Sequence, residues 1–85
     1  MSPALVLTTV NASYSRQIGA DDLVHCLRDV AAAKAIPGHM SAFFGDVAPA
    51  LQIAFAKQFG ISEIELSAAA KAFAAYSGET YPLVA

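Results

Sequence analysis

The chain has 85 residues, a formal net charge of −2, 56% hydrophobic residues and only 14% charged residues. This length corresponds to a single domain with a small core, and the apolar composition excludes a disordered chain, because disordered chains are rich in charge. The five basic residues are scattered along the sequence, which argues against the clustered Lys and Arg of a typical nucleic-acid binder.

Residues 1–19 are expected to form an extended N-terminal arm or short strand followed by a polar loop. Residues 4–10 consist mainly of Leu, Val and Thr, which favours a β-strand. Because a lone strand is unstable, this arm needs a partner, either the tail 80–85 of the same chain or the arm of a second copy. Within a single domain 1–85, the helical body is therefore predicted to span residues 20–79.

The first helix of this body is predicted over residues 21–35. Two aspartates place negative charge in its first turn, where it suits the helix dipole, and apolar residues including Cys26 recur at three- and four-residue spacing. Pro37, followed directly by Gly38, is expected to end the helix, because the residue before a proline avoids the helical conformation.

A second helical segment is predicted over residues 41–59, with a break at Gly45 and Asp46. Asp46 can cap the second piece, and Pro49 then falls in its first turn, where the missing N–H is not needed. The second piece is apolar on nearly all sides, which indicates a helix that is central in the fold or shared with a partner.

The strongest local signal follows this segment. Gly60 is placed to end the helix in a left-handed conformation, and Ser62 with Glu65 three residues later forms a capping-box pattern. The third helix is therefore predicted over residues 63–77, ending at Gly78. Together these segments predict a mainly all-α fold of three to four short helices.

The corner around Gly60 resembles a helix-turn-helix motif over about twenty residues. The resemblance rests on Ala56, Gly60, Ile61 and Leu66, which stand at the spacing of the family's crossing, turn and corner positions. It implies a second helix that reads DNA through exposed polar side chains. In this sequence those positions are Ser62, Glu63, Ser67 and Lys71.

The same helix departs from the family's pattern. Glu63 and Glu65 have the same sign of charge as the phosphates, and three consecutive alanines offer few groups that could read bases. The order of arm and helices is also similar to ribbon-helix-helix repressors, although the arm has no basic or amide side chain at residues 5–9. A DNA-binding transcriptional regulator is therefore the alternative rather than the main hypothesis.

No catalytic, cofactor-binding or metal-ligating residue is predicted. His25 and the adjacent Cys26 point about 100° apart on a helix, whereas a structural zinc site needs four convergent ligands. A nucleophilic pair of Cys26 with His39 lacks a third group that would orient the histidine. We therefore expect a protein that is not an enzyme and that requires no cofactor.

The main hypothesis is a small protein–protein interaction module, acting as a regulator, adaptor, inhibitor or assembly subunit, and self-associating as a homodimer. Low charge and a helix without a polar face favour this class. We expect a cytoplasmic location, because the single cysteine suits a reducing compartment and neither a signal peptide nor a membrane span is visible. The predicted contact residues are Phe43, Phe44, Ile53 and Lys57.

Overall fold

Helices account for all the regular secondary structure in this computed structural model, which describes residues 3–14 and 17–76. The mainly all-α prediction is confirmed, with more helices than the expected three to four. The tail 80–85 and Gly78 lie outside the described residues, and the last helix ends at Ala75, two residues before the predicted end at residue 77. The elements in chain order are α1 (Pro3–Asn11), α2 (Ala20–Ala31), the 3-10 helix η1 (Pro37–Met40), α3 (Ser41–Asp46), α4 (Pro49–Phe59) and α5 (Glu63–Ala75).

The predicted N-terminal strand is wrong: the segment forms helix α1. Val6 and Val10, one helical turn apart, are both fully buried, and α1 packs against α4. The hydroxyl of Thr9 donates to the carbonyl of Leu5 at 2.7 Å, a local bond that a β-branched polar residue can make within a helix. Burial of the two valines on α4 therefore overrides the strand preference of this segment.

Asn11 connects the end of α1 to the chain that enters α2. Its side chain is buried; the amide donates to the carbonyl of Ile18 at 3.0 Å, and the amide oxygen accepts from the backbone N–H of Ile18 at 3.3 Å. These two bonds satisfy a buried polar group and fix the path between the helices.

Helix α2 ends at Ala31, earlier than the predicted residue 35. The chain turns at Ala33, which has a left-handed φ of 61°, and Pro37 then begins η1 instead of merely ending α2. The buried face of α2 is formed by Leu23, Val24, Leu27 and Val30. Cys26, which was expected on this face, lies at its edge and is only partly buried.

The segment 41–59 is divided into two helices as predicted, but the break lies at Val47 and Ala48 and not at Gly45 and Asp46, which belong to α3. Pro49 occupies the first turn of α4 as expected, but Asp46 does not cap this helix, because α3 continues through it. The side chain of Gln52 instead donates to the carbonyls of Phe43 at 3.3 Å and Val47 at 2.9 Å. Gln52, a residue of α4, thus stabilises the break between α3 and α4.

The core consists of aliphatic residues together with a chain of phenylalanines. Phe43 and Phe55 are fully buried, and their ring centroids lie 5.6 Å apart in an edge-to-face arrangement. Phe44 on α3 stacks on Phe73 of α5 at 5.7 Å, and Phe59 contacts Phe55 within α4 at 4.7 Å. Aromatic pairs in such geometries stabilise a small core beyond their buried area.

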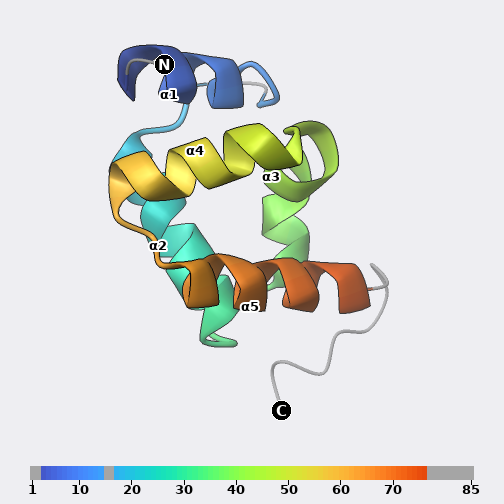
Figure 1. The fold of residues 1–85 in the computed structure, drawn as a ribbon. Helices are drawn as coiled ribbons and strands as arrows, with labels where there is room; N and C mark the ends of the chain where they lie inside the picture. The colour runs from blue at the N-terminus through green and yellow to red at the C-terminus, as the bar shows by residue number, and fades with distance from the viewer. Residues whose placement is uncertain (1–2, 15–16, 77–85) are drawn as a thin grey trace.

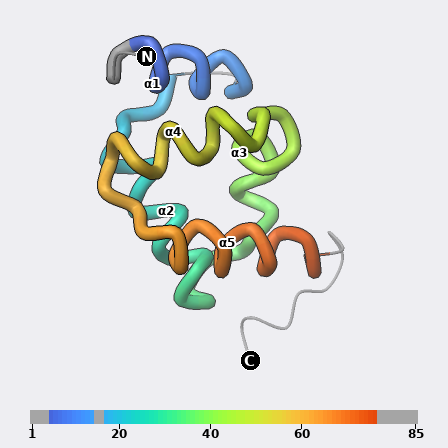
Figure 2. The backbone as a smooth tube through the Cα atoms, viewed as in Figure 1, coloured from blue at the N-terminus to red at the C-terminus, as the bar shows by residue number. Residues whose placement is uncertain are grey.

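Helix α4 lies between α1 and α5 in the view of Figure 1, and α2 and α3 lie on opposite sides of that view. The colour gradient along the backbone in Figure 2 shows α4 and α5 running in opposite directions in this view. The main packing partner of α5 is α2, whereas that of α4 is α1. Helices α4 and α5 are consecutive in the chain, but each of them packs mainly against a different helix.

Candidate docking groove between α4 and α5

The corner between α4 and α5 has the local geometry that the sequence predicts. Gly60 adopts φ 77° and ψ 24°, a left-handed conformation. The hydroxyl of Ser62 accepts from the backbone N–H of Glu65 at 3.1 Å, and the Glu65 carboxylate accepts from the backbone N–H of Ser62 at 3.1 Å. The left-handed cap and the capping box are both confirmed.

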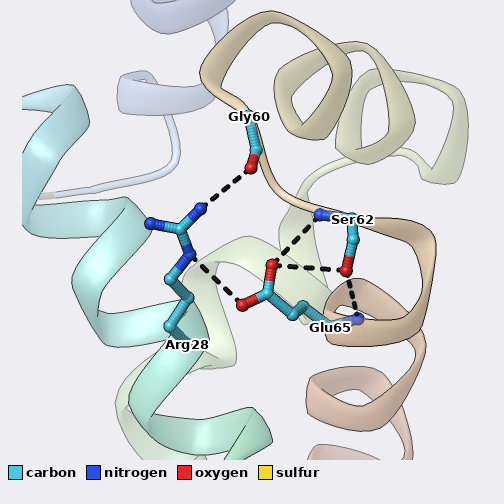
Figure 3. A network of polar contacts seen from close by, with 4 residues as sticks. All are labelled: Arg28, Gly60, Ser62 and Glu65. Carbon is cyan, nitrogen blue, oxygen red and sulfur yellow. Dashed lines mark hydrogen bonds and ion pairs between the residues drawn. The ribbon is translucent and has the colours of Figure 1, made fainter.

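Arg28 of α2 fixes this corner, a role that the sequence does not reveal. Its guanidinium donates to the carbonyl of Gly60 at 2.9 Å and lies 3.3 Å from the carboxylate of Glu65 (Figure 3). The Ser62 backbone N–H holds the pKa of Glu65 below its usual value, and the Arg28 charge lowers this pKa further. Because Arg28 is 32 residues from Gly60 in the sequence, no local pattern indicates the contact.

The helix-turn-helix resemblance holds for the turn but not for the packing of the two helices. Ala56 and Ile61 are buried, and Leu66 is partly buried against the core. In a helix-turn-helix motif the two helices pack against each other at a steep angle. Here α5 packs mainly against α2, and a groove lies between α4 and α5.

This groove has a volume of about 570 Å³, within the range of roughly 300–1,000 Å³ typical of ligand-binding clefts. Its apolar lining comes from both helices and from the corner between them: Ile53, Ala56, Ile61, Leu66 and Ala70. Its polar lining includes Lys57 of α4 and Glu63 of α5, which carry opposite charges. The groove therefore combines an apolar lining with one cationic and one anionic group.

The fold places two of the four predicted contact residues in the groove and the other two elsewhere. Ile53 and Lys57 line the groove, and the side chain of Ile53 is 49% exposed. Phe43 is fully buried against Phe55, so its assignment to a contact surface is wrong; Phe44 is partly buried and stacks on Phe73. Phe43 is a core residue and Phe44 packs against the core, because the short helix α3 directs these side chains towards α4 and α5.

The residues assigned to DNA reading are divided in a similar way. Ser62 is committed to the capping box, and Glu63 and Ser67 line the groove. Lys71 lies farther along α5 beside Ile64, which is 83% exposed. Sequence reasoning missed Ile64, although it is the large apolar residue of α5 that lies off the core-facing stripe.

A smaller cavity of about 240 Å³ brings Cys26 and His39 together with Tyr14. Burial raises the pKa of the Cys26 thiol, and Asp29 raises it further. Burial and the nearby Cys26 raise the pKa of Tyr14 to about 12. These shifts keep both groups protonated at neutral pH, whereas a nucleophilic cysteine needs its thiolate form.

In the parts of the chain that the structure describes, no group of three His, Cys, Asp or Glu residues could hold a metal ion. Over the same residues, no helix is long and apolar enough to cross a membrane. No protein-family model, curated protein or solved structure matches this chain.

Proposed function

We propose that this protein is a non-enzymatic protein–protein interaction module that binds a partner segment in the groove between α4 and α5. The supporting observation is the apolar lining of the groove, in which Ile53 keeps about half of its surface exposed. Exposed apolar surface flanked by polar groups is typical of interaction sites. Such a module would act as a regulator, adaptor, inhibitor or assembly subunit.

The occupant that we propose for this groove is an amphipathic helix of a protein partner. Small residues such as Ala56 and Ala70 between the larger side chains of the groove leave room for a row of apolar anchors. A carboxylate of that helix would face Lys57, and a basic side chain would face Glu63. The occupant is therefore expected to carry both signs of charge beside its apolar face.

A small-molecule site is less well supported by this groove. Such sites use a small number of precisely placed polar groups to orient the ligand, but the amide of Gln52 already donates to two backbone carbonyls. DNA binding receives no support from the charges on α5, since Glu63 would lie close to phosphates. The proposal includes the cytoplasmic location that the single cysteine, Cys26, indicates.

The test is a selection of helical peptides from a displayed amphipathic library on the whole protein, followed by affinity measurements on two variants. Ile53→Glu places a charge in the groove, and Leu5→Glu makes the same change on α1, where the residue is 52% exposed. We expect the selected peptides to bind Ile53→Glu at least about tenfold more weakly and to bind Leu5→Glu like the wild type.

Circular dichroism shows whether both variants stay folded, as their exposure implies. Equal peptide affinity for the two folded variants, or the absence of any selected binder, would overturn the proposal. Unfolding of Ile53→Glu would show that Ile53 belongs to the core, and Lys57→Glu, which reverses one exposed charge in the groove, would then replace it in the same comparison.

A further inference from the structure

The outer face of α5 carries an exposed apolar residue beside small ones. Ile64 is 83% exposed, and Ser67 and Ala68 lie next to it around a shallow hollow of about 340 Å³. Glu63 lies at one end of this hollow and Lys71 at the other. We call this surface, formed by residues 63, 64, 67, 68 and 71, the outer face. An isolated surface isoleucine is unremarkable, but small neighbours allow another helix to approach closely.

The two charges of the outer face are placed symmetrically about its centre. Glu63 and Lys71 are eight residues apart, which corresponds to about 12 Å along a helix, and Ser67 lies midway between them. Among the residues that the structure describes, neither Glu63 nor Lys71 forms an ion pair; the one pair found joins Arg28 to Glu65. The outer face therefore presents one negative and one positive end, both unpaired within the described chain.

We propose that the outer face binds a second copy of itself, with the two α5 helices antiparallel about a two-fold axis near Ser67 and Ala68. In this register Lys71 of each copy lies against Ile64 of the other, and its ammonium group reaches Glu63 of that copy. The aliphatic part of a lysine covers apolar surface while its charge remains hydrated. One contact thereby covers both exposed isoleucines and pairs all four charges.

Charge complementarity selects a second copy in this orientation. A parallel arrangement would place Glu63 against Glu63 and Lys71 against Lys71, whereas the antiparallel arrangement matches opposite charges at both ends. A two-fold interface uses the same patch on both subunits, and the outer face is self-complementary in this sense. The protein's net charge of −2 adds little repulsion between copies.

This inference rests on the proposed function as an interaction module, but it concerns a different surface from the groove lining at Ile53. The outer face shares Glu63 and Ser67 with the groove. The two are separated experimentally, because peptide binding to the groove is measured with Ile53→Glu and self-association with changes on the outer face.

The test measures the dimer dissociation constant by sedimentation for two charge reversals, Glu63→Lys and Lys71→Glu. Each variant alone places like charges together at both ends of the dimer, so we expect its Kd to rise about tenfold or more. An equimolar mixture of the two variants restores both opposite-charge pairs, and we expect heterodimers with a Kd close to that of the wild type.

Lys34→Glu is the matched control, because it makes the same charge change at an exposed residue outside α5, and we expect it to leave the Kd unchanged. Circular dichroism confirms that each variant is folded. A wild-type protein that stays monomeric at all concentrations would overturn the proposal, as would a dimer that neither reversal weakens or a mixture without rescue. In each of these cases, wild-type peptide binding that Ile53→Glu weakens would leave the proposed function standing.

Should Glu63→Lys unfold the domain by placing a positive charge in the first turn of α5, Glu63→Gln replaces it, paired with Lys71→Gln. Each of these variants removes one partner of both ion pairs, and the predicted dimer weakens by a smaller factor. Unchanged Kd values for both glutamine variants would then overturn the proposal.

Discussion

Arg28 and Glu65 join the last turn of α2 to the first turn of α5, with 3.3 Å between the guanidinium Nε and the carboxylate. The same carboxylate closes the capping box with Ser62, and the same guanidinium donates to the carbonyl of Gly60. A helix cap and a tertiary contact therefore share one carboxylate, so loss of its charge affects both.

The Glu65→Gln variant tests this sharing through the pH dependence of stability. The folded-state pKa of Glu65 lies below its ordinary value of 4.5, so its contribution to stability is present above pH 4.5 and is lost as pH falls through the folded pKa. We expect acid unfolding followed by circular dichroism to depend less steeply on pH below about 4.5 in Glu65→Gln than in the wild type. An unchanged acid profile would contradict the assignment.

Replacing Gly60 by alanine tests the left-handed cap. A Cβ at Gly60 meets nothing within 4 Å, so the cost comes from its positive φ alone, and we expect a loss of about 1 kcal/mol in the free energy of unfolding.

Gly45→Ala is the matched control for that change. A Cβ there also meets open space, but the residue lies inside α3, where alanine is favoured over glycine by roughly 0.5–1 kcal/mol. Urea denaturation is expected to give opposite signs for the two variants. The same sign at both positions would show that φ at Gly60 does not govern the effect.

Thr8→Asp and Val10→Asp distinguish helix α1 from the strand that the sequence favours. A strand would place residues 6, 8 and 10 on one face, whereas the helix buries Val6 and Val10 and exposes Thr8. We expect Thr8→Asp to change the melting temperature only slightly. Val10→Asp buries an unpaired carboxylate, and we expect it to unfold the domain or to lower its stability by several kcal/mol. Equal sensitivity at both positions would support the strand.

The raised pKa of Tyr14 predicts how stability and tyrosine ionisation change at alkaline pH. Its folded pKa of about 12 exceeds the ordinary value of 10.0, so its contribution to stability is fully present below pH 10 and is lost as pH rises towards 12. We expect ultraviolet titration of the folded protein to detect a tyrosine that ionises near pH 12. Tyr14→Phe removes that step; its persistence in the variant would assign it to another tyrosine.

Local signals predicted the elements around the corner well, because capping depends on residues close in sequence. Gly60, Ser62 and Glu65 each stabilise backbone groups within four residues, and the structure places all three as expected. The chain break before Pro49 is also local, since it depends on the missing N–H of the proline. The side-chain contact at this break was not predicted, because Gln52 of α4 donates back to the carbonyls of Phe43 and Val47.

The candidate site was predicted in part. Ile53 and Lys57 were identified because α4 lacks a clean polar face, and both line the groove. Phe43 was misassigned because the same apolar composition describes a core residue and an interface residue equally well. The contact with Phe55 and the break at Val47 place Phe43 in the core, and residue type or spacing alone does not show this.

The sequence by itself determined the helical class, the corner at Gly60 and the capping box, since each arises from interactions between near neighbours along the chain. Only the tertiary structure decided that residues 3–11 form a helix, because the burial of Val6 and Val10 on α4 outweighs their local strand preference. Tertiary packing also decided that α5 joins α2 through Arg28 and Glu65, which leaves a groove between α4 and α5. Contacts between residues about thirty positions apart depend on how whole helices pack, and a local sequence pattern does not predict this packing.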